Sequence, residues 1–571
     1  MLKFHINPKD TRYIFITSDE PEEIEPLEKH LNRIPLYQLL PKYTGIPKPE
    51  VFLNRFMGRD KKWIYYCSMG LWRDIVEFCK KKRISLDATA ILPKYRYTNF
   101  DMTKEQFREY VLGWGMSIEP YDYQLDAAWL ILKYQRSLSE LATRAGKTLI
   151  GYMVFRTAME KLGVKKILMI VPSIHLVKQG AKDFEKYKDY FKAEQIWANG
   201  EEVSMANLTF GTFQSLVLRC DPRSKHYNPD YYKDYDMILV DEAHKIPCKS
   251  IQVILNQEFT KNLKMMFGFT GTLPKQNSIE WLACQASAGP KIQQISAHEL
   301  VERGFLADPI IKQIRIKYKS SSLSDDIIEF GEYICSIYED DENGNHIKLP
   351  KEQQLMTMTY KKILPTGFKI AKKESTREEY IELILNQVRE RQQTLVLEQM
   401  LTMFSEPHTK VVVDLVRNLH KNTIVFAHNT EYINYLVERF KKEFPDRNIM
   451  KIVGNITIKK RQKIIDEMSK SDNCVLVGSF GCVGTGLTFS RVNYGIFAQS
   501  FSSDIISKQS LGRLMLKQED KQKFYLYDII DVYPTKKLYQ QGLDKIKTYK
   551  AEQHEYFIEN IDTEYTRIKL V

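Results

Sequence analysis

The feature that most restricts the fold of this chain is a recurring alternation of short apolar, β-rich runs with segments of helical character. Such an alternation predicts parallel β-sheets with helices packed on both faces. The runs form two groups separated by roughly 150 residues, and each group has about the size of one such domain. We therefore predict an α/β protein with two lobes, whose strands include Ile167 to Val171, Met237 to Val240, Met265 to Phe269, Thr423 to Ala427, Val475 to Val477 and Phe524 to Tyr527.

The 571 residues of the chain exceed the length that one hydrophobic core usually serves, so we expect about three domains. The first hundred residues have a separate character, with aromatic residues beside basic ones and the basic run Lys80 to Arg83. Such a run is more often a solvated helix end, but the neighbouring aromatic side chains make nucleic-acid contact an equally good interpretation. We predict a small N-terminal α+β nucleic-acid-binding domain over residues 1–112, lobe one over 113–317, a linker or insertion over 318–375, and lobe two over 376–571.

Composition excludes several classes of protein. The net charge of +12, from 84 Lys and Arg against 72 Asp and Glu, favours a polyanionic partner only weakly in so long a chain. No apolar stretch could span a bilayer and the N-terminus lacks an apolar signal segment, so we expect a cytoplasmic protein. Eight cysteines without a C-x-x-C pair argue against a zinc site. An acidic turn over Glu339 to Asn345 is not a calcium loop, because Pro350 replaces the required glutamate.

A candidate phosphate-binding loop covers Leu141 to Thr148, with the sequence Leu-Ala-Thr-Arg-Ala-Gly-Lys-Thr, and precedes a segment of helical pattern. In such a loop, backbone N–H groups and the helix N-terminus hold the phosphates, Lys147 reaches the β- and γ-phosphates, and Thr148 ligates magnesium. Leu141 stands where the general pattern has its first glycine. Taken alone, the Gly-Lys-Thr tripeptide is more often an ordinary turn.

A second motif changes this interpretation. Asp241-Glu242-Ala243-His244 directly follows the apolar run that ends at Val240, so a buried strand would present the two carboxylates at its carboxyl end. Asp241 would hold magnesium and Glu242 would act as the general base toward the attacking water. A chance acidic cap explains an Asp-Glu pair alone, but it explains poorly the two motifs in this order. The pair predicts a nucleotide-hydrolysing site.

Further segments follow in the order found in the superfamily-two helicases, which this chain resembles through nearly its whole length. Two positions depart from that pattern: Arg144 replaces the middle glycine of the phosphate loop, and Leu516, with Lys517 beside it, replaces a further arginine of motif VI. The resembling segments are Pro120 to Gln124 (the adenine-reading Q motif), Val171 to Ser173 with Val177 to Gln179 (Ia), Thr212 to Ser215 (Ib), Gly268 to Leu273 (III), Ile424 to Asn429 (IV), Gly478 to Phe480 with Gly484 to Gly486 (V) and Gln509 to Arg513 (VI).

The resemblance implies two RecA-like lobes with ATP and Mg²⁺ between them. It implies Lys147, Asp241 and Glu242 as catalytic residues, with Arg513, or Lys517 in its place, as the arginine finger; Thr148 and Asp241 would hold the metal. The implied nucleotide-binding residues are Gln124, Thr143, Arg144, Ala145, Gly146, Lys147, Thr148, His244, Gly486, Gln509 and Arg513. The implied nucleic-acid-binding residues are Pro172, Ser173, Thr212, Gln214, Asn429 and Ser479.

The N-terminal region, the phosphate loop and the tail from Leu526 are similar to the UvsW family of bacteriophage branch-migration helicases. That similarity implies an ATP-dependent DNA helicase or translocase, acting as a monomer in the host cytoplasm on branched DNA such as forks, Holliday junctions and R-loops. Two alternatives stay open. One is an RNA helicase or a duplex translocase, and the other is a nucleotide-gated DNA clamp with little hydrolysis, which Arg144 and Leu516 would favour.

Overall fold

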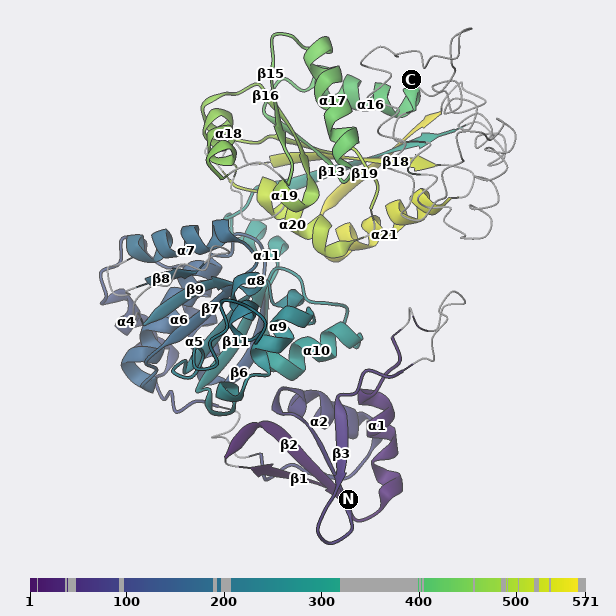
Figure 1. Ribbon diagram of the computed structural model, residues 1–571. Helices are drawn as coiled ribbons and strands as arrows, with labels where there is room; N and C mark the ends of the chain where they lie inside the picture. Colours follow the sequence, from purple (N-terminus) through teal and green to yellow (C-terminus); the bar gives the residue numbers. More distant parts are fainter. Residues whose placement is uncertain are drawn as a thin grey trace. The chain divides into compact units, whose positions relative to one another are not determined.

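The chain forms two compact units, residues 1–296 and 297–571. Its structure is a computed structural model (Figure 1). Among the described residues, no helix combines the length and the apolar character needed to cross a bilayer. The structure describes residues 1–7, 9–35, 38, 48–91, 97–187, 193–196, 207–318, 399, 402, 405–454, 458–483, 489, 491–501, 503–517, 523–532 and 536–562.

The first sheet has five strands in the order β3-β4-β2-β1-β5 and is antiparallel except for the β1–β5 pair. Along β2, Ile14 and Ile16 are buried while Phe15 between them is half-buried, which is the alternation of a strand with one face on a core. Two helices bury Leu27 and Ile75 against that face, so the predicted α+β domain is confirmed. Its elements are β1 (Leu2–Asn7), β2 (Asp10–Ser18), η1 (Pro21–Glu23), α1 (Glu25–Leu31), β3 (Leu53–Met57), β4 (Trp63–Ser68), η3 (Met69–Leu71), α2 (Trp72–Lys82) and β5 (Leu86–Asp87).

Helix α4 (Lys104–Leu112) packs on lobe one rather than on this sheet. A guanidinium nitrogen of Arg108 lies 2.5 Å from a carboxylate oxygen of Asp122 in helix α5 (Asp122–Lys133). The indole N–H of Trp129, also in α5, donates to the carbonyl of Met102 at 2.9 Å. Residues 104–112 therefore pack with lobe one, whereas the sequence predicts them in the N-terminal domain. An amphipathic helix does not by itself indicate which partner covers its apolar face.

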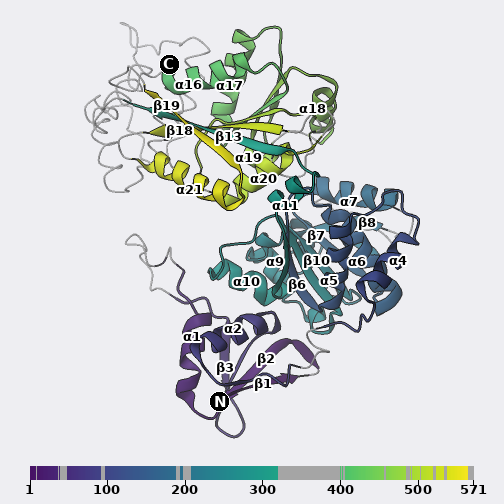
Figure 2. The ribbon, with the colours of Figure 1, turned by 180° about the vertical axis from the view of Figure 1, so that it is seen from behind.

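Lobe one has a seven-stranded parallel sheet in the order β12-β6-β11-β10-β7-β9-β8. All residues of β7 and β9 are buried, as expected for strands covered on both faces. Figures 1 and 2 show α5 and α6 on one face of the sheet and α9 and α10 on the other. The remaining elements are β6 (Arg136–Leu141), α6 (Lys147–Leu162), β7 (Ile167–Val171), α7 (Ile174–Tyr187), β8 (Ala193–Ile196), β9 (Leu208–Thr212), α8 (Phe213–Leu216), η4 (Val217–Arg219), β10 (Met237–Asp241), η5 (Ala243–Lys245), α9 (Lys249–Leu255), η6 (Glu258–Asn262), β11 (Met265–Thr270), α10 (Ile279–Ala288) and β12 (Lys291–Ile295).

Lobe two has a second seven-stranded parallel sheet, in the order β15-β16-β14-β17-β18-β13-β19. Figures 1 and 2 show α16 and α17 on one face and α20 and α21 on the other, so the predicted two parallel α/β lobes are confirmed. The elements are α11 (Ala297–Glu302), β13 (Asp308–Lys317), α16 (Glu406–Asn418), β14 (Thr423–Ala427), α17 (Thr430–Glu443), β15 (Asn448–Ile452), α18 (Ile458–Lys470), β16 (Cys474–Ser479), α19 (Phe480–Val483), β17 (Tyr494–Phe497), α20 (Asp504–Leu514), β18 (Lys523–Val532), α21 (Lys537–Ala551) and β19 (Glu555–Asp562).

Strand β13 shifts the boundary between the lobes. The sequence predicts residues 308–317 in lobe one, but this strand pairs with β18 and β19, and the second unit begins at Ala297. Its partners lie more than two hundred residues further along the chain, as for the hydrogen bond between Gln313 and Asp528, so no local pattern identified them. The predicted insertion over 318–375, apart from Tyr318, and the predicted ligand Gly486 lie outside the described residues.

Candidate active site

The predicted residues of lobe one lie at one edge of its sheet. Because β6, β11, β10, β7 and β9 are parallel, their carboxyl ends meet at this edge. The phosphate loop follows β6, Asp241 ends β10 and Thr270 ends β11. The register pairs Glu140 with Thr270, and Asp241 with Phe269. The tertiary structure thus brings together the two motifs that the sequence places about a hundred residues apart.

The phosphate loop has a left-handed backbone at two positions. Gly146 has φ +80°, and Arg144 has φ +72°. The left-handed region favours glycine, and a non-glycine residue there costs roughly 1–2 kcal/mol. Arg144 therefore occupies the conformation that explains a glycine at this position in the family pattern. Helix α6 begins directly after Gly146, so its first N–H groups lie at the loop.

Gln124 of the predicted Q motif packs directly against this loop. Its side-chain amide donates a hydrogen bond to the carbonyl of Ala145 at 3.1 Å, and its amide oxygen accepts from the backbone N–H of Tyr121 at 3.0 Å. A Cβ atom at Gly146 would overlap with the Gln124 amide nitrogen, so this approach requires glycine. The contact with adenine that the resemblance implies stays a prediction.

Lys147 and Thr148 stand at the start of α6, and both are half-buried. The ammonium group of Lys147 donates to the carbonyl of Leu141 at 3.2 Å, so the side chain lies over the loop. Thr143 lies beside Gly271, where an added Cβ would be 3.6 Å from the threonine hydroxyl oxygen. The ammonium group of Lys147, the hydroxyl of Thr148 and the carboxylate of Asp241, which ends β10 at the same edge of the sheet, are a set of groups that fits a magnesium nucleotide.

In the Asp-Glu-Ala-His segment, the residue predicted to act as the general base has an unusual backbone conformation. Glu242 has φ +54°, a left-handed conformation that is uncommon for glutamate and that turns the chain sharply after Asp241. Nδ1 of His244 lies 3.3 Å from a carboxylate oxygen of Glu242 and 2.9 Å from the hydroxyl oxygen of Thr270. Because the Thr270 hydroxyl donates its own proton to the carbonyl of Thr272 at 3.0 Å, Nδ1 of His244 carries the hydrogen in this contact.

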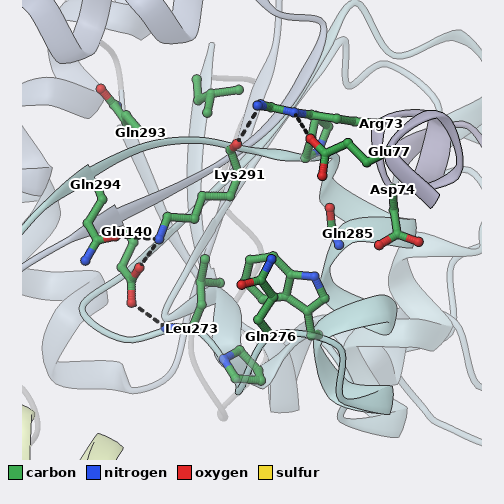
Figure 3. A pocket seen from close by; sticks show the side chains of 14 residues that line it. Arg73, Asp74, Glu77, Glu140, Leu273, Gln276, Gln285, Lys291, Gln293 and Gln294 are labelled. Atoms are coloured by element: carbon green, nitrogen blue, oxygen red, sulfur yellow. Dashed lines mark hydrogen bonds and ion pairs between the residues drawn. The ribbon is translucent and has the colours of Figure 1, made fainter. Parts of the chain in front are cut away.

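Glu140 is a residue of this edge that the sequence did not single out. One carboxylate oxygen accepts from the backbone N–H of Leu273 at 3.1 Å, and the other lies 2.5 Å from the ammonium group of Lys291 (Figure 3). Arg73 of α2 donates to the carbonyl of Lys291 at 3.3 Å. Glu140 therefore ties the end of β6 to the segment after β11. In the sequence, Glu140 is marked only as a charged residue near the end of a mostly buried strand.

These contacts line a pocket of about 470 Å³ between α2 and lobe one (Figure 3). Glu77 and Arg73 contribute from α2, and Trp281 and Gln285 from α10. The pocket shows that the N-terminal domain docks on the helix and strand that flank the phosphate-loop strand. Leu282 of α10 belongs to the buried core of the N-terminal domain, so this docking is partly apolar.

The predicted nucleic-acid contacts of lobe one differ in exposure. Pro172 and Ser173 follow β7 and are half-buried, and Gln214 is exposed. Thr212 is buried, and its hydroxyl accepts from the backbone N–H of Ser215, so it caps helix α8. Of the predicted motif Ib pair, Gln214 is the side chain that presents polar atoms at the surface.

In lobe two, Ser479 ends β16, and Asn429 lies two residues after the end of the neighbouring parallel strand β14, because Ala427 pairs with Ser479. The side chain of Asn429 accepts from the backbone N–H of Tyr432 and caps α17. Gln509 and Arg513 stand one turn apart on α20, on the same helix face, and both are half-buried.

Leu516, which replaces the second arginine of motif VI, has a structural partner. It forms an isolated antiparallel bridge with Leu306, and the carbonyl of the preceding Met515 accepts from the backbone N–H of Ala307 at 2.8 Å. The ammonium group of Lys517 lies 3.4 Å from the position that a Cβ would take at Gly304. This segment holds the start of lobe two against the end of α20.

A parallel sheet that ends in a phosphate loop and an Asp-Glu pair defines the site as that of a nucleotide-dependent motor domain. Residues 117–275 match the family model "Type III restriction enzyme, res subunit", and residues 407–515 match "Helicase conserved C-terminal domain". The chain belongs to the superfamily-two helicases, and its two parallel sheets are the RecA-like lobes of that class.

Known relatives carry similar sequence. The chain is 24% identical over 491 residues to "ATP-dependent DNA helicase uvsW" of Enterobacteria phage T4, which covers 81% of this chain and 82% of the relative. It is 25% identical over 278 residues to "DNA 3'-5' translocase XPB2" of Sulfurisphaera tokodaii, covering 48% of this chain and 54% of that protein. The crystal structure of T4 UvsW aligns with 98% of this chain and 99% of its own, at 19% identity and a TM-score of 0.42.

Proposed function

We propose that this chain is an ATP-dependent DNA helicase that couples Mg²⁺-ATP hydrolysis to the unwinding or branch migration of branched DNA. The observation that carries the proposal is the sheet edge where the phosphate loop, Asp241 and Glu242 meet and where His244 contacts the neighbouring strand at Thr270. The similarity to a phage DNA helicase over most of both chains supports DNA as the partner.

The residues of lobe one account for the hydrolytic step. Lys147 compensates the charge of the β- and γ-phosphates, and the N–H groups at the start of α6 hold the phosphate oxygens. Thr148 and Asp241 hold Mg²⁺, which supplies charge neutralisation on the transferred phosphoryl group. Glu242 takes the proton from the attacking water. His244 keeps the Glu242 carboxylate in place through the 3.3 Å contact.

Lobe two supplies the second half of the proposed mechanism. Arg513, with Gln509 one turn before it, meets the nucleotide and stabilises charge in the transition state. Ser173 and Gln214 of lobe one, with Asn429 and Ser479 of lobe two, hold one strand through its phosphates and do not read bases. Cycles of lobe closure and opening then move the protein along the strand.

The backbone conformation of Arg144 is relevant to the alternative function, a nucleotide-gated DNA clamp that hydrolyses little ATP. The missing glycine favours that alternative, but Arg144 adopts a left-handed backbone conformation, which is the conformation that glycine favours. A general base at Glu242 has no use in a pure clamp. The RNA helicase and the duplex translocase stay as alternatives that the choice of substrate decides.

The test is a steady-state ATPase measurement with no nucleic acid, single-stranded DNA, blunt duplex, forked DNA and single-stranded RNA, together with strand displacement on the fork. We expect the largest stimulation by forked DNA and displacement only with hydrolysable ATP. Stimulation by RNA alone would contradict a DNA helicase. Stimulation by blunt duplex without displacement would indicate a duplex translocase, and ATP-dependent binding without turnover would indicate a clamp.

A further inference from the structure

One face of the N-terminal sheet carries a group of aromatic side chains that its core does not use. Tyr13 and Phe15 of β2, Phe56 of β3 and Tyr66 of β4 share this face, because Phe15 pairs with Tyr66 across β2 and β4 while the residues between them along each strand point to the core. None of the four belongs to the buried core of the domain, which lies on the opposite face under α1 and α2.

The four rings form one continuous surface, which we call the aromatic face. Phe15 lies 6.4 Å from Phe56 and 6.1 Å from Tyr66 between ring centroids, and Tyr66 lies 6.0 Å from Phe56 and 5.7 Å from Tyr13. Phe56 is 42% exposed, and Tyr13, Phe15 and Tyr66 are half-buried. Exposing so many rings on one face costs hydrophobic free energy, so a partner is expected to cover them.

Cationic side chains border this face at two places. The guanidinium of Arg12 lies 5.1 Å above the ring of Tyr13 and is also paired with the carboxylate of Asp10 at 2.7 Å. The turn between β3 and β4 carries the exposed cations Arg59, Lys61 and Lys62, together with Asp60, whose carboxylate accepts from the backbone N–H of Lys62 at 3.2 Å. Aromatic rings bordered by cations are the chemistry that binds single-stranded nucleic acid, because bases stack on the rings and phosphates contact the cations.

The aromatic face is also separate from the motor edge of lobe one. Strand β2 contacts η6, where the hydroxyl of Thr11 donates to the carbonyl of Lys261 at 3.1 Å. Helix η6 leads into the amino end of β11, whereas Thr270 and the motor motifs stand at the carboxyl ends of the strands. A strand on the aromatic face is therefore a different segment from one held by Ser173 and Gln214.

We infer that the aromatic face of the N-terminal domain is a stacking platform for a second, single-stranded segment of the branched DNA substrate. The inference rests on the proposed function, since it assigns one strand to the motor lobes and another to this sheet. It requires no sequence preference, because every base offers a face for stacking.

The chain offers a matched control on the same hairpin. Trp63 is 44% exposed, but it pairs with Met57 and faces the side opposite to Phe56. Its ring is also covered by the guanidinium of Arg55 at 4.8 Å. Substitution of Trp63 removes an exposed aromatic side chain of similar size from the same two strands without touching the aromatic face.

The experiment measures fluorescence anisotropy of a labelled oligo-dT and a labelled blunt duplex with the full chain carrying Phe56→Ala, Phe56→Leu, Phe56→Tyr or Trp63→Ala. We expect Phe56→Ala and Phe56→Leu to weaken oligo-dT binding about fivefold or more, since a stacked base is lost. Phe56→Tyr, Trp63→Ala and all duplex affinities should stay within about twofold of the wild type. The ATPase turnover at saturating DNA should not change, because Phe56 lies outside the motor lobes.

Several results would overturn the inference. If Phe56→Ala bound oligo-dT with wild-type affinity, bases would not stack on this face. If Phe56→Leu bound with full affinity, an apolar contact would be sufficient for binding and stacking would not be needed. A wild-type dimer that Phe56→Ala converts to monomer, measured by light scattering, would assign the face to a second copy of the chain. Failure of the proposed function is distinct, because there the wild type itself would show no DNA-stimulated ATPase, whatever the Phe56 variants bind.

Discussion

Nδ1 of His244 lies 2.9 Å from the hydroxyl oxygen of Thr270, and this contact joins the ends of the neighbouring strands β10 and β11. Nδ1 of His244 also lies 3.3 Å from a carboxylate oxygen of Glu242. The proposed general base is therefore linked through His244 and Thr270 to the segment that follows β11. On its other side that segment is held by Glu140 through the N–H of Leu273. The segment that follows β11 is therefore in contact with both the strand of the Asp-Glu pair and the strand of the candidate phosphate loop.

Thr270→Val should separate hydrolysis from unwinding. The variant keeps the side-chain shape but removes the hydroxyl that accepts from His244, so DNA-stimulated ATPase should stay within about tenfold while fork displacement per ATP falls further. Thr157→Val is the control, because Thr157 is equally buried and its hydroxyl has no hydrogen-bond partner within the described residues. Equal losses of ATPase and displacement would show that the His244–Thr270 contact does not couple hydrolysis to unwinding.

Lys147→Ala and Glu242→Gln should both abolish DNA-stimulated ATPase, by about a hundredfold or more. The first removes charge compensation at the phosphates and the second removes the base, so Glu242→Gln should still bind ATP in equilibrium titration with a fluorescent analogue. Lys161→Ala, at the opposite end of α6, is the control and should turn over normally. Wild-type turnover in either test variant would show that the residue has another role.

Arg144→Gly should preserve ATPase and should not destabilise the chain, because the loop already has a glycine-like backbone at φ +72°. Arg144→Val should lower the free energy of unfolding by about 1–2 kcal/mol relative to Arg144→Gly, since a β-branched residue tolerates this region poorly. Urea denaturation of both variants measures the difference. Equal stability of the two would mean that residue 144 does not adopt the left-handed conformation.

Arg513→Ala should slow single-turnover hydrolysis by on the order of a thousandfold at saturating ATP and DNA, with a much smaller change in ATP affinity. Lys517→Ala tests the alternative that this lysine supplies the charge missing at Leu516. The variant with the larger loss identifies the finger. Near-normal rates in both would exclude motif VI charge from the mechanism, and a fall in thermal stability without a slower chemical step would indicate a structural ion pair.

His408 in lobe two should make stability depend on pH. Burial lowers the pKa of His408, but the charge of Asp531, 3.0 Å away, and hydrogen bonds to Asp531 and the carbonyl of Ala498 raise the pKa overall. A raised folded pKa gives stability that is fully present below about pH 6.5 and is lost as pH rises through the folded value.

The free-energy difference between wild type and His408→Gln, measured by urea denaturation, should therefore be largest near pH 6 and shrink toward pH 9. His420→Gln is the control, because His420 is exposed in the same lobe. A difference that stays constant with pH would show that the pKa of His408 is the same in the folded and the unfolded protein, and a difference that grows with pH would show that the folded pKa is lowered.

Local sequence patterns predict the fold class of the two lobes and the strands that carry the site. Buried parallel strands are continuous apolar runs, so β7 and β14 were predicted at their observed bounds. The position of Asp241 and Glu242 at a strand end also followed locally, since the apolar run stops directly before them. These features depend on residues that are close together along the chain, so they can be predicted from the sequence alone.

The folded structure, in contrast, shows which segments meet. It assigned β13 to lobe two and α4 to lobe one, and it placed His244 against Thr270. It also left Phe15 and its neighbours outside a core that their aromatic character alone would have suggested. The physical reason is the same in each case: strand order, the choice of helix partner and the face that a sheet leaves uncovered depend on contacts between residues far apart in the chain, and such contacts leave no mark in the local pattern.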